Sequence, residues 1–314
     1  MDLRNLAQDF LEALQIEKGR SPLTITKYTL YLRRFLDWTN CTNPNQITQD
    51  VVRKFRLRLA QKTIDHPGKG KVGEQLSRGA QNGHLIAIRS FLRYLAKRDI
   101  ESLSPDKIDL AKIPERTVNF LDAFELEQIL KAPVQKFGQS AIAIRDTAIL
   151  EMLFSTGLRV SELAHLQKNQ IHDRSDEISV RGKGGKMRVV FVSARAREAL
   201  QKYLKTRVDD CPVLFIRADK GRGHLTKNTQ SLTSRSIERM VSAYVAYCGL
   251  GKKITPHTLR HSFATDLLQN GADLRSVQAL LGHSSIMTTQ IYTHVTDQHL
   301  ADIHKAFHSK RRKK

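Results

Sequence analysis

The chain has 314 residues, of which 40% are apolar, enough for roughly one to three folded domains and too many for a disordered chain. Lys and Arg number 52 against 31 Asp and Glu, so the formal charge of +21 predicts a polyanionic partner, with nucleic acid ahead of an anionic membrane surface. We expect no membrane segment and a cytoplasmic location. No apolar run would span a bilayer, no secretory signal opens the chain, and Cys41, Cys211 and Cys248 are too few and too far apart for a disulfide framework.

The first hundred or so residues are predicted to form a helical domain. A first helix begins near Leu3, a second follows the cap and proline of Ser21-Pro22, and a third starts after Thr48. A fourth helix carries Leu85 to Leu95, after a loop at 65–73 that is rich in glycine and lysine.

The helical pattern lapses between Leu103 and Phe120, where Pro105 and Pro114 stand in a polar setting. Such a composition is typical of a linker between domains. We therefore assign residues 1–110 to the helical domain, 111–121 to the linker, and 122–314 to a second domain.

The second domain is predicted to mix helices with a little sheet. One helix opens at Asp122 and an apolar helix stops near Gly157. Between Glu177 and Val192, apolar residues alternate on both sides of a glycine-lysine turn, which predicts a hairpin, and 213–216 is a candidate third strand. Helices return after Ser234. The predicted fold is mainly α-helical with a small antiparallel β-sheet, in two basic lobes that clamp a duplex.

Local motifs in the second domain combine residues that carry charge or chemistry. They are Thr156-Gly157-Leu158-Arg159-Val160-Ser161-Glu162-Leu163, then Gly182-Lys183-Gly184-Gly185-Lys186, then Pro256-His257-Thr258-Leu259-Arg260-His261-Ser262-Phe263-Ala264-Thr265, and finally Leu281-Gly282-His283-Ser284-Ser285 followed by Ile291-Tyr292.

Each of these signals has a plainer interpretation when it is taken alone. A lone tyrosine such as Tyr292 is more often a packing residue, and Lys183 fits a solvated turn. His257 and His261 are spaced like a zinc pair, but Thr258 stands where such helices carry a glutamate, so no metal site is expected. The stretch 68–73 spells a dinucleotide-binding loop but follows no predicted strand.

Taken together and in this order, the motifs resemble the tyrosine recombinase (phage integrase) family, and in particular its short Xer-type members. The resemblance extends from about Ser21 to the last helix. It implies an N-terminal core-binding (SAM-like) domain and an α+β catalytic domain. It also implies an active site composed of Arg159, Lys183, His257, Arg260, His283 and Tyr292.

The reaction of that family explains why these residue types are needed. A tyrosine hydroxyl attacks a DNA phosphodiester through a five-coordinate transition state, so Tyr292 would be the nucleophile of a 3′-phosphotyrosyl intermediate. Arg159 and Arg260 are permanently charged forks that suit the phosphate oxygens, and His283 would add a hydrogen bond. His257 is a suitable acceptor for the tyrosine proton.

Two further residues complete the expected site. The resemblance makes Lys183 the acid that protonates the departing 5′ oxygen. Glu162, about one helical turn after Arg159, is expected to hold that arginine or a histidine in place, with a surface carboxylate as the alternative. Because one phosphoester replaces another and the arginines supply the charge, we expect no ATP, metal or other cofactor.

The resemblance also implies partners. These are double-stranded DNA with a specific recombination site and a homo- or hetero-tetramer on two duplexes, and a DNA translocase or a second recombinase is a further candidate. Leu300, Ile303 and Phe307 share one face of a predicted final helix, which either packs on its own domain or docks into a neighbouring subunit as a subunit-exchange helix. The expected role is Xer-like resolution of chromosome or plasmid dimers. The alternatives are a mobile-element integrase and a DNA-binding protein without activity.

Overall fold

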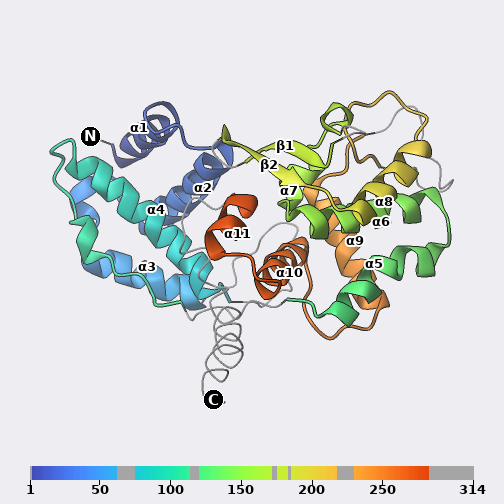
Figure 1. Ribbon diagram of the computed structural model, residues 1–314. Helices are drawn as coiled ribbons and strands as arrows, with labels where there is room; N and C mark the ends of the chain where they lie inside the picture. The colour runs from blue at the N-terminus through green and yellow to red at the C-terminus, as the bar shows by residue number, and fades with distance from the viewer. Residues whose placement is uncertain are drawn as a thin grey trace, which may run out of the picture. The chain divides into compact units, whose positions relative to one another are not determined.

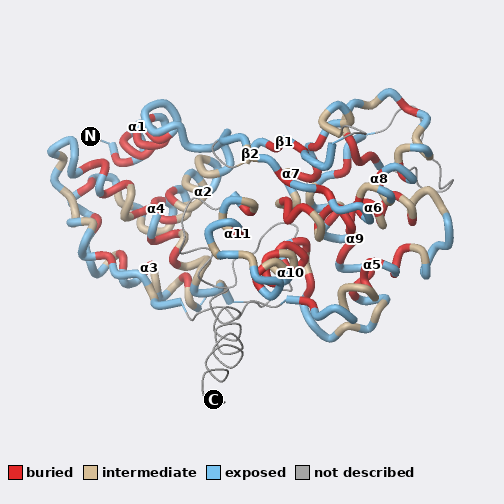
Figure 2. Tube along the Cα trace, in the orientation of Figure 1, coloured by how far each residue is buried: buried red, intermediate tan, exposed pale blue. Residues whose placement is uncertain are grey.

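The computed structural model of the chain describes residues 2–61, 75–113, 120–171, 175–182, 185–217 and 230–282 (Figure 1). The chain divides between Arg116 and Thr117 into two units. Each unit has its own hydrophobic core, which Figure 2 shows as red stretches along the helices. The predicted loop at 65–73 and the predicted final helix at 297–307 lie outside the described residues.

The N-terminal unit is built from the helices that the sequence predicted. They are α1 (Leu3–Ile16), α2 (Pro22–Thr39), α3 (Gln49–Gln61) and α4 (Arg78–Ala96), with short 3-10 turns η1 (Pro44–Gln46) and η2 (Pro105–Lys107). The Ser21 hydroxyl accepts from the Thr24 N–H and Pro22 opens α2, so local caps fix the start of this helix. The core of the N-terminal unit is rich in aromatic rings, including Phe10, Phe35, Phe55 and Phe91.

The segment that follows Leu103, where the helical pattern lapses, packs on the N-terminal unit as far as Ala111. Ile108 is 3% exposed within the N-terminal core. The Asn82 side chain donates to the Ala111 carbonyl at 2.8 Å and accepts from the Ala111 N–H at 3.0 Å. The loss of helical periodicity after Leu103 therefore marks the end of regular helix and not the end of the unit.

The C-terminal unit surrounds one apolar helix, α6 (Ala141–Thr156), which contacts α5 (Ala123–Phe137), α8 (Ala194–Lys205) and α10 (Pro256–Gln269). Because neighbours cover it on several sides, α6 is apolar around most of its circumference. The other helices in the described part of this unit are α7 (Val160–Ala164), η3 (Lys168–Gln170), α9 (Ser234–Tyr247) and α11 (Leu274–Leu281).

The predicted hairpin is present as β1 (Glu177–Arg181) and β2 (Met187–Phe191), which pair antiparallel. Ile178 lies opposite Val190, and both are buried. The alternation of apolar residues in β2 would place Met187, Val189 and Phe191 on the buried face, but these side chains are 62%, 41% and 51% exposed. The buried face of β2 carries Val190 and also Arg188, which lies opposite Val180.

The candidate third strand is wrong. Within the described residues the sheet has two strands, and Val213 and Ile216 form only isolated bridges, with Gln167 and Ser231 respectively. Residues 214–216 are fully buried, so burial accounts for their apolar character. None of the helices in the described ranges combines the length and the apolar composition that crossing a membrane requires.

Candidate active site

Arg159 lies where α6 ends and α7 begins. α6 ends at Thr156, and its C-cap is Gly157, whose φ of 58° lies in the left-handed region that glycine adopts without strain. A Cβ atom there would lie 2.5 Å from Cδ1 of Phe263, so the approach of α10 also requires glycine. The turn makes Arg159 the N-cap residue of α7 and leaves its side chain 25% exposed.

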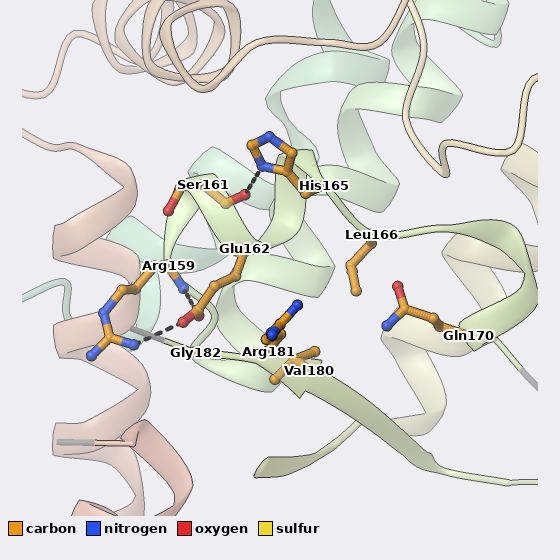
Figure 3. A pocket seen from close by; sticks show the side chains of 9 residues that line it. All are labelled: Arg159, Ser161, Glu162, His165, Leu166, Gln170, Val180, Arg181 and Gly182. Carbon is orange, nitrogen blue, oxygen red and sulfur yellow. Dashed lines mark hydrogen bonds and ion pairs between the residues drawn. The ribbon is translucent and has the colours of Figure 1, made fainter. Parts of the chain in front are cut away.

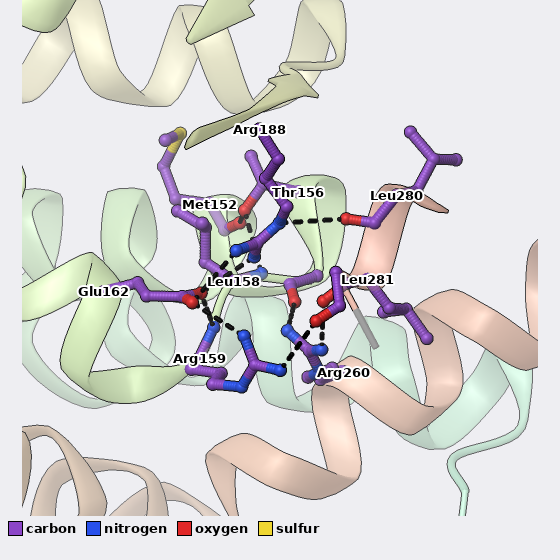
Figure 4. Close-up of polar contacts among 11 residues, drawn as sticks. Met152, Thr156, Leu158, Arg159, Glu162, Arg188, Arg260, Leu280 and Leu281 are labelled. Atoms are coloured by element: carbon purple, nitrogen blue, oxygen red, sulfur yellow. Dashed lines mark hydrogen bonds and ion pairs between the residues drawn. The ribbon is translucent and has the colours of Figure 1, made fainter. Parts of the chain in front are cut away.

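The Glu162 carboxylate is the centre of a hydrogen-bonded cluster (Figure 4). Its Oε1 accepts from Nη1 of Arg159 at 2.8 Å and from Nη1 of Arg188 at 2.9 Å. Its Oε2 accepts from the backbone N–H of Arg159 at 2.9 Å and from Nη2 of Arg188 at 2.8 Å. Burial raises the pKa of Glu162, but these donors outweigh burial and lower the pKa from 4.5 to about 2. Glu162 is therefore ionised at neutral pH and fixes the guanidinium group of Arg159.

Arg260 comes from α10 and is 3% exposed. Its Nη1 donates to the Gly157 carbonyl at 2.6 Å, and its Nη2 donates to the Leu281 carbonyl at 2.5 Å. A buried guanidinium group is costly unless its N–H groups find acceptors. The carbonyl groups at the ends of α6 and α11 supply them, and Arg260 thereby lies beside Arg159.

Arginines occupy successive carbonyl groups at the C-terminal end of α11 (Figure 4). Arg188 Nε donates to Leu280 O at 3.2 Å, and Arg159 Nη2 donates to Gly282 O at 3.2 Å. Arg260 takes the carbonyl between them. These acceptors have no partner within the helix and form the negative end of its dipole, so cations suit the position.

His257 and His261 lie on the same helix as Arg260, with ring centroids 6.2 Å apart. The partial loss of surrounding water, and then the charges of Arg260 and Arg159, lower the pKa of His257 below its ordinary 6.5. Burial, His257 and Arg260 lower the pKa of His261 to about 4. Both rings are therefore neutral at pH 7, and a neutral ring nitrogen can accept a proton.

A pocket of about 570 Å³ opens beside Arg159 and Glu162 (Figure 3). Backbone and side chains from α7, η3 and β1 line it, and His165 on its rim hydrogen-bonds through Nδ1 to the Ser161 carbonyl at 2.6 Å. Its lining residues are Arg159, Ser161, Glu162, His165, Leu166, Gln170, Val180, Arg181 and Gly182.

The structure thus brings together Arg159, Glu162, His257 and Arg260. Lys183, His283 and Tyr292 lie outside the described residues, so their roles stay predictions. The residues directly before two of them belong to the cluster. Gly282 accepts from Arg159, and a Cβ at Gly182 would lie 3.2 Å from Nη1 of Arg188.

Arg188 was not among the site residues predicted from the sequence. The signal that could have found it is its position in β2, two residues from Val190 and therefore on the same, buried face of the strand. An arginine on a buried face needs a carboxylate partner. That signal was hidden because Met187, Val189 and Phe191 form a more apolar alternation on the opposite, exposed face. As for metals, the described residues hold no group of three or more His, Cys, Asp or Glu side chains that would bind an ion.

Comparisons with known proteins agree with this architecture. The model of the phage integrase family matches residues 119–299, and the model of the phage integrase N-terminal SAM-like domain matches residues 7–99. The chain therefore belongs to the phage integrase family, the tyrosine recombinases. It is of the Xer type, an enzyme of site-specific recombination that breaks and rejoins DNA strands. The predicted family, fold class and enzyme class are confirmed.

Individual relatives resemble the chain over nearly its whole length. Tyrosine recombinase XerD of Lacticaseibacillus casei is 34% identical over 309 residues, 98% of this chain and 99% of the relative. Tyrosine recombinase XerC of Pelobacter propionicus is 36% identical over 304 residues, 95% and 93% of the two chains. The XerH recombinase bound to its palindromic difH substrate shares the fold, with a TM-score of 0.67, 22% identity, and coverage of 95% of this chain and 83% of that chain.

Proposed function

We propose that the chain cleaves a specific DNA site with Tyr292 as nucleophile, forms a 3′-phosphotyrosyl bond, and rejoins the strand to a second duplex. One observation carries the proposal. Arg159 and Arg260, which lie far apart in the sequence, converge on the C-terminal end of α11, directly before His283 in the chain. Two fixed guanidinium groups suit the charge that builds up on a phosphodiester under attack.

In this mechanism each group has a separate task. Arg159 and Arg260 hold the non-bridging oxygens of the phosphate, and His283 donates a further hydrogen bond. His257 accepts the proton of the Tyr292 hydroxyl, which its lowered pKa allows because the ring is neutral at pH 7. Lys183 protonates the departing 5′ oxygen.

The proposed reaction exchanges one phosphoester bond for another and so needs no added energy source. The bond from phosphorus to the 5′ oxygen breaks as the bond to the tyrosine oxygen forms, and rejoining reverses both changes. The phosphoester bond energy is kept in the protein–DNA adduct, so we propose that neither ATP nor a metal takes part. Because arginine is almost never deprotonated, Lys183 is the better donor for the leaving oxygen.

The partners follow from the family and the charge. We propose that the chain binds double-stranded recombination-site DNA and works as a multimer, a homo- or hetero-tetramer on two duplexes. Related recombinases have been crystallised with DNA, and one, lambda integrase, as a dimer on its core site. The formal charge of +21 supports strong binding to the phosphate backbone. Residues 1–110 are the proposed core-binding domain, 111–121 the linker and 122–314 the catalytic domain.

The proposed role is Xer-like resolution of chromosome or plasmid dimers in the cytoplasm. Relatives named XerD and XerC match over nearly their full length, which favours this role over integration of a mobile element. Reconstitution with purified components tests whether a DNA translocase or a second recombinase takes part. Recombination by this chain alone on a paired site excludes the need for either.

The test of the proposal is capture of the covalent intermediate. The target site is first selected from random duplexes by binding to the Tyr292→Phe protein. A suicide substrate with a nick beside the cleavage position is then built from that site. We expect the wild-type protein to form an adduct that survives denaturant, and the Tyr292→Phe protein to bind the DNA without forming one. Absence of the adduct with a tightly bound site contradicts the proposal.

A further inference from the structure

Arg188, which lies outside the expected active-site set, is the residue through which β2 reaches the site (Figure 4). Its side chain is 10% exposed. Both of its terminal nitrogens bond the Glu162 carboxylate, at 2.9 and 2.8 Å, and its Nε bonds the Leu280 carbonyl at 3.2 Å. One guanidinium group thus joins the hairpin, α7 and α11.

Packing alone does not explain an arginine at this position. Arg188 lies on the buried face of β2, opposite Val180. A buried ion pair is on average no more stabilising than an aliphatic residue of similar size, because both charges lose their water. What the arginine adds is geometry, since a planar fork fixes both oxygens of a carboxylate at once.

Glu162, whose carboxylate is oriented by Arg188, in turn orients Arg159. Each of its oxygens accepts one bond from Arg159 and one from Arg188. With Arg188 in place, the Glu162 carboxylate is not free to rotate. Arg159 therefore bonds a carboxylate whose orientation Arg188 has fixed. Without Arg188, Glu162 would retain only its bonds to Arg159 and would be free to turn toward the pocket that it lines.

The same side chain controls the end of α11. The φ of Gly282 is 62°, and a Cβ atom there would lie 2.8 Å from Cδ of Arg188. The aliphatic stem of Arg188 therefore lies directly against the residue that precedes His283. A Cβ at Gly182, which precedes Lys183, would lie 3.2 Å from Arg188 Nη1.

We propose that Arg188 is a positioning residue of the cleavage reaction: it fixes Glu162, and through it Arg159, and it sets the ends of the two segments that continue into Lys183 and His283. This inference rests on the proposed function, since it assigns Arg188 to the same phosphotransfer. Arg188 itself touches no reacting atom. Its effect is on the rate of cleavage in bound DNA and not on binding.

The experiment compares matched pairs of variants. Arg188→Lys keeps the charge and loses the fork, and Arg207→Lys makes the same change at a buried arginine paired with Asp209, away from the site. Single-turnover adduct formation on the suicide substrate gives the cleavage rate, and gel shift gives DNA affinity. We expect Arg188→Lys to cleave on the order of 10- to 100-fold more slowly at unchanged affinity. Arg207→Lys is expected to cleave at the wild-type rate once bound.

A pH profile separates positioning from general loss of structure. Arg188→Met removes two of the donors that hold the pKa of Glu162 at about 2 against the effect of burial, so the pKa of that carboxyl rises. The ratio of variant to wild-type cleavage rates should therefore be smaller at pH 5.5 than at pH 7.5. If Arg188→Met does not fold, the lysine pair carries the test alone.

The outcomes are distinct. Failure of the wild-type protein to form an adduct overturns the proposed function. A wild-type adduct, together with equal cleavage rates for Arg188→Lys and wild type, overturns only the role of Arg188. An equal loss in the Arg188→Lys and Arg207→Lys proteins would also overturn it, because it would show that disturbing any buried ion pair slows the reaction.

Discussion

At the scale of single residues, the site depends on how one carboxylate is kept charged. Glu162 has a side chain that is only 8% exposed, and burial by itself favours the neutral acid. The donors from Arg159 and Arg188 reverse that preference and lower the pKa to about 2. A carboxylate that is held ionised on both oxygens is a rigid support, which a neutral side chain at the same place would not be.

Replacement of Glu162 by Gln tests this account through stability. The folded-state pKa lies below the ordinary 4.5, so the stabilisation is complete above pH 4.5 and is lost as the pH falls toward 2. A shift of this size corresponds to about 3 kcal/mol of free energy of unfolding. We expect urea unfolding at pH 7 to show a loss of roughly that size in Glu162→Gln.

The pH dependence supplies the control for that prediction. Wild type should lose stability relative to Glu162→Gln as the pH is lowered from 4.5, so the two unfolding free energies should converge in acid. A difference that stays constant from pH 7 to pH 3 would contradict the assignment of the low pKa to Glu162.

At the scale of elements, the site is formed where helices end. Gly157 is the C-cap of α6, Arg159 is the N-cap of α7, and Gly282 is the C-cap of α11. Helix ends carry backbone groups without partners inside the helix, and here arginine side chains satisfy the carbonyl groups of α11. Arg260 also takes the Gly157 carbonyl, so the ends of α6 and α11 are joined through one side chain.

Gly157→Ala should disrupt this junction. The left-handed φ disfavours any Cβ, and Phe263 would have to move because its ring would lie 2.5 Å from the new atom. We expect a loss of about 2–4 kcal/mol in the free energy of unfolding. Gly249→Ala is the matched control, because Gly249 has a φ of 66° but no neighbour within 4 Å, and it should cost only about 1–2 kcal/mol. Equal losses in urea unfolding would show that the contact with Phe263 contributes nothing.

At the scale of the whole molecule, the chain combines high charge with two units of separate core. The basic excess predicts tight, salt-sensitive binding to DNA, while the order of strand exchange in the proposed tetramer must come from contacts between subunits. We propose that these two properties reside in different parts of the chain, so that truncation would separate them.

Deletion of the residues after Asp297 should separate them. The predicted final helix carries Leu300, Ile303 and Phe307 on one face, which suits docking to a neighbour. We expect the truncated protein to bind one site within about threefold of wild type and to recombine two sites roughly 100-fold less well, because linked contacts are lost. Ile303→Asp should reproduce the defect, and Lys305→Gln, off the apolar face, should not. Unchanged strand exchange by the truncated protein would contradict the docking role.

The sequence by itself determined the helices of the N-terminal unit, the hairpin, and the membership of Arg159, His257 and Arg260 in one candidate site. Helical periodicity, capping residues and short motifs are local signals, which the chain carries whatever its neighbours do. The resemblance of four ordered motifs then joined segments that no single pattern would have linked.

Only the tertiary structure decided which face of β2 is buried, that residues up to Ala111 pack on the first unit, and that Arg188 bonds Glu162 and the end of α11. The physical reason is the same in each case. Burial of a strand face, or pairing of a buried charge, depends on side chains that are far away in sequence. The alternation of apolar residues within β2 contains no information about those side chains, and it therefore indicated the face of Met187, Val189 and Phe191.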